Sequence, residues 1–439
     1  FEALEATLKA RTNFELRRPP PGGWGLDRMD GLLASLGSPQ LSYPVVHVAG
    51  TTGKGTTCSA LASVLDAAGL KVGLTTSPHL VDLRERIRVG ASPASDALWL
   101  ESAEEVLAAA NQSDAPTYFE LVIAMAFVAF RRAAVDVAVV EVGLGGRLDA
   151  TNLVQPAVSV ITRIGLDHCE LLGADLRSVA NEKAGIVKAK VPVVIGAGPA
   201  EAEQTIRERA QEVGAPVLVA KAIEVLERSP GRTRVRVCSR GWTGEVTTPL
   251  TPRVAQNLAL VAVAVEALGA AIGRALLAAL PRGLARVRWR GRFDVLSPTP
   301  SRPRLVIDGA HDPDSVSALL EGIKSQDERR PVGLLGMLKG KRTTEICALL
   351  AAACCEAFSC DAPSPRALPA SSLRLELASA GLDARATSDL DAALALAQAR
   401  ALELNVPLVV AGSLYLAGAV LAKLAEDVSS VWGSSSRGP

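Results

Sequence analysis

The chain has 439 residues, of which 49% are hydrophobic, 3% aromatic and 21% charged, with a formal net charge of +1. This near-neutral balance, without basic tracts interleaved with aromatic residues, disfavours a nucleic-acid-binding protein. The length predicts two or three domains with sizeable cores.

Short runs of Val, Ile and Leu alternate with alanine-rich helical segments in the first half of the chain. Runs that are apolar throughout are typical of strands covered on both faces, and their alternation with helices predicts a mostly parallel α/β sheet. The expected strands are Val45–Val48, Val72–Leu74, Val135–Val140, Val158–Thr162, Val191–Ile195 and Val217–Val219. The expected helices include Thr56–Ala68, Ala97–Ala110, Glu120–Arg132, Ser178–Val187 and Glu201–Val213.

The middle of the chain changes in character. Charged residues alternate over Glu224–Thr248, which predicts an antiparallel hairpin region. The apolar stretch Leu258–Leu280 contains Glu266 and Arg274, so we expect one or two buried helices there and no membrane span. Proline, glycine and arginine over Pro281–Arg292 predict an exposed linker.

A second, smaller α/β set follows the predicted linker. Its expected strands are Leu305–Ile307, Val332–Leu335, Ala357–Cys360 and Leu408–Val410, and a loose Ser/Gly-rich tail is expected at 429–439. Seven scattered cysteines without a CxxC pair disfavour a zinc site and predict reduced thiols. Together with a first segment unlike a signal peptide, they indicate a cytoplasmic protein.

A glycine-rich loop links the first expected strand to the next helix. Its sequence is Val45-Val-His-Val-Ala-Gly-Thr-Thr-Gly-Lys-Gly-Thr-Thr57. Converging backbone N–H groups and the helix dipole predict a phosphate site, with Lys54 as a cation and the hydroxyls of Thr56 and Thr57 near a bound Mg²⁺. The spacing departs from the strict P-loop, because Val48 replaces the first glycine and Gly55 follows the lysine. The alternative is an ordinary glycine turn.

Several polar residues follow other expected strands, where ligands of open α/β sheets gather. Ser77 and His79 follow one strand, and Glu141 ends another, where a buried carboxylate is costly unless it is paired or binds metal. Asp167 and His168 follow a third. Structural roles are the alternative for the histidines, and the charged group Arg84-Glu-Arg-Ile-Arg88 equally fits a solvated face.

Lys183 lies in a mostly apolar helical segment. It is either a surface lysine whose stem packs on apolar groups, or a buried amine of lowered pKa, which can take up CO₂ to form a metal-binding carbamate. In the second half, Asp308 ends a strand and could accept from ribose hydroxyls, with His311 in the next loop. An arginine of Trp289-Arg-Gly-Arg-Phe293 could reach phosphates. Ordinary turn chemistry is the alternative for both.

In their order along the chain, these motifs resemble folylpolyglutamate synthase and the bifunctional dihydrofolate/folylpolyglutamate synthases of the Mur ligase superfamily. The resemblance runs from about Gly25 to Lys423. Its motifs are Val48–Thr56, Thr76–Arg88, Glu141–Asn152, Ile164–His168, Glu182–Ile186, Asp308–His311 and Gly412–Leu416.

The resemblance implies an α/β fold in which a mostly parallel P-loop ATPase domain precedes a smaller Rossmann-like domain. Residues 1–284 would bind ATP and folate, 285–428 would form the glutamate-ligase domain, and 429–439 a flexible tail. The implied nucleotide-binding residues are Gly50, Thr51, Gly53, Lys54, Gly55, Thr56, Thr57, Asn257, Arg292, Asp308 and His311. The implied Mg²⁺ ligands are Thr56, Ser77, Glu141, His168 and a carbamylated Lys183, and the implied substrate-binding residues are Arg84, Phe119, Glu120 and Asp149.

Three positions depart from the family pattern. Thr52 stands where the family loop usually has Asn, Asp312 replaces the Asn of Gly-Ala-His-Asn-Pro, and Lys339-Gly-Lys341 replaces an expected Asp-Lys-Asp. Asp312 adds a negative charge near the implied nucleotide and glutamate sites. These departures bear on the specificity of the second domain more than on the reaction.

The expected activity is that of a monomeric, ATP- and Mg²⁺-dependent ligase that joins L-glutamate to dihydropteroate or folates through an acyl phosphate. Lys54, Glu141, His168 and Lys183 would be its catalytic residues. The alternatives are a Mur-type amide ligase for another carboxylate, such as a cell-wall precursor, and a non-catalytic nucleotide-binding regulator. A P-loop kinase or GTPase is disfavoured by the loop spacing.

Overall fold

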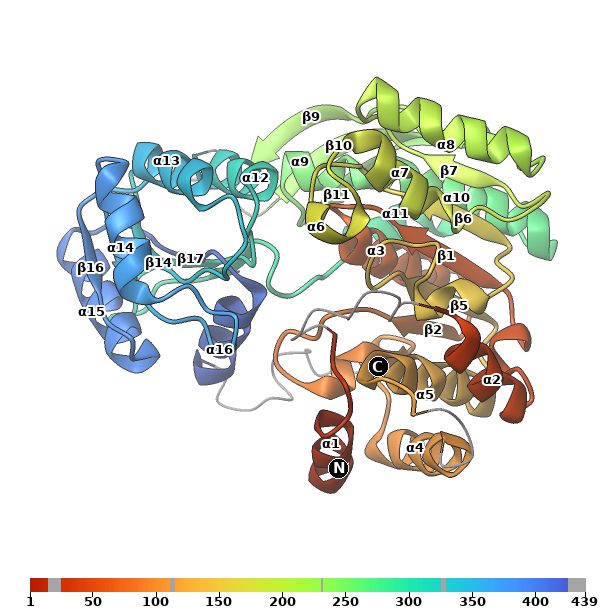
Figure 1. The fold of residues 1–439 in the computed structure, drawn as a ribbon. Coiled ribbons are helices and arrows are strands. Elements are labelled where there is room, and N and C mark those ends of the chain that lie inside the picture. The colour runs from red at the N-terminus through yellow and green to blue at the C-terminus, as the bar shows by residue number, and fades with distance from the viewer. Residues whose placement is uncertain (15–24, 111–114, 230–231, 325–328, 425–439) are drawn as a thin grey trace, which may run out of the picture. The chain divides into compact units, whose positions relative to one another are not determined.

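The computed structural model describes residues 1–14, 25–110, 115–229, 232–324 and 329–424 (Figure 1). The chain forms two compact units. Unit 1 comprises Phe1–Glu227, Thr233–Pro249 and Val254–Arg288, and unit 2 comprises Arg228–Arg232, Leu250–Arg253 and Trp289–Pro439. The tail predicted at 429–439 lies outside the described residues.

Unit 1 is built on an eight-stranded sheet with the order β4-β3-β2-β5-β1-β6-β7-β8. The strands from β2 to β8 in this order are parallel, and β3 and β4 extend the sheet antiparallel. The loops after β1, β5 and β6 therefore meet at one edge. The strands are β1 (Val45–Ala49), β2 (Val72–Thr75), β3 (Ile87–Val89), β4 (Ser92–Pro93), β5 (Val137–Glu141), β6 (Val158–Ile161), β7 (Val193–Ile195) and β8 (Val217–Val219).

Helices cover both faces of this sheet (Figure 1). On one face α3 (Lys54–Ala67) packs with α10 (Asn257–Ile272) and α11 (Leu280–Ala285). The opposite face carries α5 (Tyr118–Arg132) in one apolar cluster, and α7 (Leu176–Ala184) with α8 (Ala200–Glu212) in another. Around α5 lie α1 (Glu2–Lys9), α2 (Asp27–Ser35) and α4 (Asp96–Ala110).

The predicted hairpin region is a three-stranded sheet of order β11-β10-β9, in which β10 and β11 are antiparallel. Its strands are β9 (Glu224–Ser229), β10 (Arg232–Cys238) and β11 (Thr243–Thr248), and α9 (Pro252–Ala255) follows. The segment Pro252–Ile272 is long and apolar enough to cross a membrane by length and composition alone. Its α10 part packs on α3, β6 and β7, which is the position of a core helix.

The linker prediction over Pro281–Arg292 is wrong in its first part. Leu280–Ala285 forms α11, which packs on α3 and buries Leu280 and Leu284 completely. A Cβ on Gly283 would lie 2.4 Å from the Cα of Val64, so only glycine permits this close approach. Proline at the start of α11 is compatible with a helix, because the first turn does not need its N–H.

Unit 2 contains a six-stranded sheet of order β12-β13-β17-β14-β15-β16, which is parallel except for β12. One face is covered by α12 (Pro313–Lys324), α13 (Thr343–Ala353) and α14 (Ala370–Ser379), which share one apolar cluster. The strands are β12 (Asp294–Leu296), β13 (Leu305–Ile307), β14 (Val332–Leu335), β15 (Glu356–Ser359), β16 (Ala384–Ala386) and β17 (Leu408–Ala411). Helices α15 (Leu390–Glu403) and α16 (Leu414–Leu424) pack on β14 and β17.

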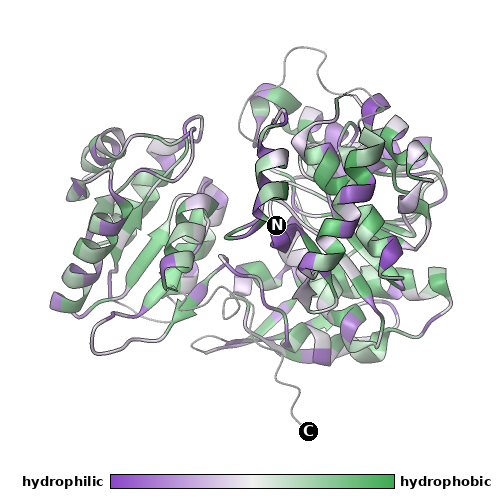
Figure 2. Ribbon diagram, turned by 90° about the horizontal axis from the view of Figure 1, so that it is seen from below, coloured by the Kyte–Doolittle hydropathy of each residue, from purple (hydrophilic) through white to green (hydrophobic). Residues whose placement is uncertain are grey.

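The predicted α/β class with parallel-rich sheets is confirmed, and the predicted central strands differ from the observed ones by at most two residues at either end. Figure 2 shows that these strands are predominantly hydrophobic. The strands that the sequence did not reveal are β3, β4, β12 and β16, which lie at or next to sheet edges. They are two or three residues long and mostly not buried, so they lack an apolar run.

Candidate active site

The phosphate loop, defined here as Gly50–Gly53, joins β1 to α3. Gly50 has a φ of 145° and Gly53 a φ of 89°. A Cβ on Gly50 would lie 1.8 Å from Oγ1 of Thr162, and one on Gly53 would lie 2.8 Å from the side-chain amide of Asn257. The loop therefore needs glycine at both positions, and it places the predicted Asn257 directly against the loop.

The loop amides have unequal roles. The N–H groups of Thr51 and Thr52 both donate to the carbonyl of Arg163, at 3.0 and 3.3 Å. The hydroxyl of Thr51 bonds to Gly165. Donors for an anion are therefore left to the first turn of α3, where N–H groups have no partner within the helix. The sequence did not predict a role for Thr162 or Arg163, because these residues follow the neighbouring strand β6 and meet the phosphate loop only in the folded sheet.

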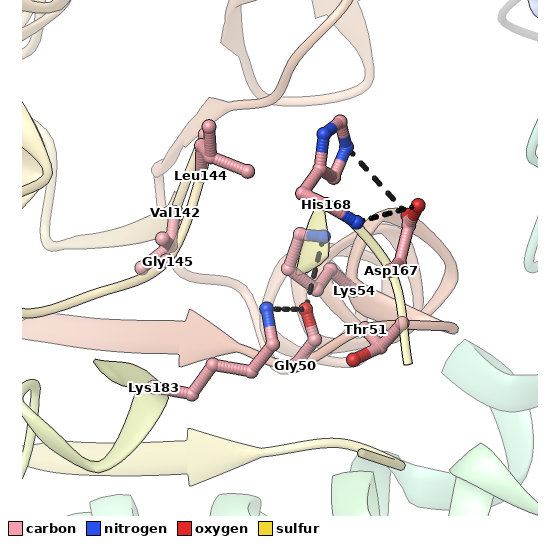
Figure 3. Close-up of a pocket in the computed structure, with 10 residues that line it drawn as sticks. Gly50, Thr51, Lys54, Val142, Leu144, Gly145, Asp167, His168 and Lys183 are labelled. Carbon is pink, nitrogen blue, oxygen red and sulfur yellow. Dashed lines mark hydrogen bonds and ion pairs between the residues drawn. The ribbon is translucent and has the colours of Figure 1, made fainter. Parts of the chain in front are cut away.

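Two lysine side chains converge on one carbonyl oxygen of the phosphate loop (Figure 3). The Nζ atoms of Lys54 and Lys183 lie 3.1 and 3.0 Å from the oxygen of Gly50. Lys183 comes from α7 and is 4% exposed, so the interpretation as a surface lysine is wrong. Burial, followed by repulsion from Lys54, lowers the pKa of Lys183 to about 7.

A cavity lies beside these amines and is closed on its far side by the loop after β5 (Figure 3). We call Gly143–Gly146 the glycine loop. A Cβ on Gly143 would lie 2.5 Å from the ring of Phe119, and one on Gly146 would lie 2.8 Å from the carbonyl oxygen of Glu182. Close packing against α5 and α7 explains these glycines. The cavity is lined by Gly50, Thr51, Lys54, Val142, Gly143, Leu144, Gly145, Asp167, His168 and Lys183.

Glu141 and Ser77 are brought together by neighbouring strands. Glu141 ends β5 and is 4% exposed, and its Oε2 accepts a 3.2 Å hydrogen bond from the backbone N–H of Ser77. Asp167 and His168 line the cavity after β6, with 3.6 Å between Oδ2 of Asp167 and Nε2 of His168. Within the described residues, no group of three His, Cys, Asp or Glu side chains is placed to hold a metal ion. A metal would therefore need hydroxyl, phosphate or water ligands as well.

The four residues predicted to bind substrate have other contacts in the structure. Arg84 forms ion pairs with Asp82 and Asp96 and lies over the ring of Phe1. Glu120 caps α5 and pairs with Arg28 at 3.1 Å. The ring of Phe119 packs against Gly143 of the glycine loop.

Asp149 is 3% exposed and stabilises the segment that follows the glycine loop. Its Oδ2 accepts from the N–H of Leu144 at 2.9 Å, and its Oδ1 accepts from Thr151. Burial raises the pKa of Asp149, and these hydrogen bonds oppose the rise. The substrate-binding roles of all four residues stay predictions.

Among the predicted residues of unit 2, Asp308 and His311 follow β13, and Arg292 precedes β12. Asp308 accepts from the N–H groups of Phe293 and Ala310 at 2.8 and 2.7 Å, and burial raises its pKa to about 6 while Arg292 opposes the rise. His311 lies 2.8 Å from the Gly309 carbonyl through Nδ1, and burial, then Lys341, lower its pKa to about 4. The nucleotide-binding roles of Arg292, Asp308 and His311 stay predictions.

Asp312, which replaces the Asn of the family motif, has a local structural role. Its Oδ1 accepts from the N–H of Ser315 at 2.9 Å, and its Oδ2 accepts from the hydroxyl of Ser315 at 2.6 Å. Asp312 thus caps the first turn of α12 (Pro313–Lys324). Asn caps helices about as well as Asp, so this exchange can preserve the turn while changing its charge.

Comparisons with known proteins agree on one family. Residues 48–265 match the Mur ligase middle domain, and residues 291–414 match the Mur ligase glutamate ligase domain. The chain is 33% identical over 404 residues to folylpolyglutamate synthase from Lacticaseibacillus casei, covering 89% of this chain and 92% of that protein. It is 37% identical over 318 residues to dihydrofolate synthase/folylpolyglutamate synthase from Escherichia coli, covering 72% of each chain.

Solved structures give the same result. Folylpolyglutamate synthase from Mycobacterium tuberculosis, complexed with ADP and AMPPCP, matches with a TM-score of 0.85 and 30% identity, covering 97% of this chain and 98% of that one. E. coli FolC in complex with DHPP and ADP matches with a TM-score of 0.82 and 32% identity, covering 96% and 97%.

Proposed function

We propose, since the chain belongs to the folylpolyglutamate synthase/dihydrofolate synthase family of Mur ligases, that it is an ATP-dependent ligase that adds L-glutamate to a folate-type carboxylate. The observation that carries this proposal is the convergence of Lys54, the first residue of α3, and Lys183 on the carbonyl oxygen of Gly50 in the phosphate loop. Two amines beside a helix N-terminus suit a polyphosphate, whose negative charge would offset their mutual repulsion.

The reaction has two steps. A carboxylate oxygen of the acceptor attacks the γ-phosphorus of ATP, the bond to the β,γ-bridging oxygen breaks, and ADP and an acyl phosphate form. The amine of L-glutamate then attacks the acyl carbon and loses a proton, the C–O bond breaks, and phosphate leaves. Lys54 would leave the Gly50 carbonyl to stabilise the transferring phosphoryl group, and positioning supplies most of the rate enhancement.

We propose Thr56, Ser77, Glu141 and His168 as the residues that would hold Mg²⁺. The buried Glu141 carboxylate adjoins Ser77, and Thr56 lies in the first turn of α3, so the oxygen donors suit a hard cation that keeps water and phosphate ligands. When bound, Mg²⁺ would neutralise charge on the β- and γ-phosphates. The chain's own part is to hold the Glu141 carboxylate against the N–H of Ser77, on the strand next to the one that leads into the phosphate loop.

Lys183 is proposed to carry a carbamate. Its pKa of about 7 leaves much of the amine neutral at physiological pH, and only the neutral amine attacks CO₂. Attack of Nζ on the carbon of CO₂ forms an N–C bond and releases one proton. The resulting anion would relieve the repulsion between Lys183 and Lys54 and add an oxygen ligand in the cavity that both lysines line.

The two units would bind different substrates. We propose that unit 1 binds ATP and the folate-type acceptor, and that unit 2 binds L-glutamate and meets the nucleotide through Arg292, Asp308 and His311. The acceptor is dihydropteroate, a folate, or both. We also propose that the enzyme is a monomer. A cytoplasmic location is proposed because all seven cysteines are free thiols.

The proposed ligase activity is tested by measuring phosphate release. The assay contains ATP, Mg²⁺ and L-glutamate, with dihydropteroate or tetrahydrofolate as the acceptor. We expect glutamate-dependent release with at least one acceptor, and at least a roughly 100-fold loss in Lys54→Ala without a change in melting temperature. Substituting cell-wall carboxylates for the folates tests the other Mur-type activity. Binding of nucleotide without release for any acceptor would support a regulator and contradict the ligase.

A further inference from the structure

We propose that His47, Thr151 and Asp149 form a buried positioning chain, which holds the glycine loop (Gly143–Gly146) in place beside the phosphate loop. This inference deepens the proposed function and rests on it for its effect on turnover. It assigns a role to His47, a histidine that none of the functional predictions included.

The chain of hydrogen bonds starts in the middle of the central strand β1. His47 is fully buried and pairs in register with Val140 of β5 and Ser159 of β6. Its Nε2 lies 2.9 Å from Oγ1 of Thr151, and that hydroxyl lies 2.5 Å from Oδ1 of Asp149. Thr151 and Asp149 are 0% and 3% exposed, so water does not compete for these bonds.

The direction of each bond follows from the number of protons. The single hydroxyl proton of Thr151 is donated to the Asp149 carboxylate, so Oγ1 must accept from an N–H on Nε2 of His47. Burial, with a contribution from Lys188, lowers the pKa of His47 to about 3, so the ring is neutral and its Nδ1 carries no proton. Nδ1 is buried and has no hydrogen-bond partner in the described part of the chain.

The other end of the chain reaches the cavity wall. Oδ2 of Asp149 accepts from the N–H of Leu144 at 2.9 Å, within the glycine loop. Leu144 and its neighbours line the cavity that also contains the side chains of Lys54 and Lys183 (Figure 3). The positioning chain thus connects the strand that leads into the phosphate loop with the opposite wall of the same cavity.

The unpartnered Nδ1 makes His47 a poor choice for stability alone. A buried acceptor without a partner is unfavourable, and a leucine of similar size would avoid that penalty. A role in packing alone therefore predicts that His47→Leu is neutral or stabilising and leaves turnover unchanged. A role in positioning predicts a stable protein with a loosened glycine loop and reduced turnover.

Paired substitutions distinguish the roles of Nδ1 and Nε2 of His47. They also distinguish the role of the Thr151 hydroxyl from that of the shape of its side chain. Gln places its amide N–H near the position of Nε2, whereas Asn reaches only the position of Nδ1. Thr151→Ser keeps the hydroxyl, and Thr151→Val keeps the shape without it. The matched control is Tyr43→Phe, which removes a buried 3.0 Å hydrogen bond to the Phe127 carbonyl away from the cavity.

The readouts are hydrogen exchange of a peptide spanning 142–146, the melting temperature, and steady-state kinetics. We expect His47→Leu, His47→Asn and Thr151→Val to speed exchange in that peptide, and to lower kcat about tenfold or more with the KM for ATP within about twofold. His47→Gln and Thr151→Ser should restore most of both properties. Tyr43→Phe should alter the melting temperature alone.

Several outcomes would overturn the inference. These are unchanged exchange and turnover in His47→Asn and Thr151→Val, equal defects in the Gln and Asn variants, or faster exchange of the same peptide in Tyr43→Phe. If a Thr151 variant fails to fold, the comparison of His47→Gln with His47→Asn still tests the inference. If the wild-type chain ligates no acceptor, the proposed function fails, and the exchange data alone test the positioning chain.

Discussion

Individual residues decide the chemistry of this site through burial. The sequence allows Lys183 to be either a surface lysine or a buried amine, and its 4% exposure shows that it is buried. Asp312 reads as an added charge near a ligand site, and the structure places it at a helix cap. The sequence predicts no function for His47 because it lies inside an apolar run. In the structure it forms a hydrogen bond with Thr151, about 100 residues later in the chain.

The lowered pKa of Lys183 predicts a pH dependence. We expect turnover at fixed dissolved CO₂ to rise with pH with a midpoint near 7, because the neutral amine is the form that reacts. Lys183→Arg should abolish the rise, since a guanidinium stays charged. The measurement is kcat against pH in CO₂-free and bicarbonate-supplemented buffer, and identical profiles in both buffers would contradict the carbamate.

The same pKa has a consequence for stability. Between about pH 7 and the ordinary value of 10.5, the unfolded chain binds a proton at Lys183 that the folded chain does not. This group therefore adds a rise in stability with pH through that window and is unfavourable below it. Comparison of wild type with Lys183→Met by denaturant unfolding at pH 6 and pH 9 should show a larger gain for Met at pH 6.

Gly50 predicts a large local effect on stability. Its φ of 145° and a Cβ position 1.8 Å from Oγ1 of Thr162 make Gly50→Ala both strained and sterically blocked. We expect the free energy of unfolding to fall by roughly 2 kcal/mol or more. Gly214→Ala is the control, because its φ is also positive but no atom lies within 4 Å, and it should cost about 1 kcal/mol.

At the scale of elements, short edge strands depend on their neighbours more than on their own residues. The sequence predicts the parallel strands because they are buried on both faces. It misses β16, whose three residues are partly or fully exposed and whose place follows from pairing with β15. It takes the start of α11 for a linker, because proline and glycine there resemble a loop until the contact with Val64 is known.

The cap of α12 gives a prediction at this scale. Asp312→Asn should retain the stability of the wild type within a few tenths of a kcal/mol, whereas Asp312→Ala should cost about 1 kcal/mol because the N–H of Ser315 loses its acceptor. Denaturant unfolding followed by circular dichroism measures both. If the Asn variant were as unstable as the Ala variant, the charge of Asp312 rather than its capping bond would be the stabilising feature.

At the scale of the whole molecule, two units with separate apolar cores carry the candidate residues. Lys54, Glu141 and Lys183 belong to unit 1, while Arg292, Asp308 and His311 belong to unit 2. Each unit contains a sheet with its own apolar clusters. This division predicts that the units unfold in separate transitions.

We therefore expect two unfolding transitions in urea, of which the transition of unit 1, which carries the phosphate loop, shifts the more with Mg²⁺ and a non-hydrolysable ATP analogue. At a ligand concentration of 100 times Kd, the shift should be about 2.7 kcal/mol. Leu350→Ala, in the core of unit 2, should lower the other transition by roughly 2 to 4 kcal/mol and leave the nucleotide-dependent shift in place. A single transition that responds to both changes would show that the units unfold together.

The sequence by itself determined the α/β class, the central strands, the phosphate loop and the family, because apolar runs and glycine-rich motifs are local and survive without neighbours. Only the tertiary structure decided that Lys183 is buried, that Arg163 occupies the amides of Thr51 and Thr52, and that His47 bonds to Thr151. The physical reason is that burial and hydrogen-bond partners depend on segments distant in the chain, which only the folded sheet brings into contact.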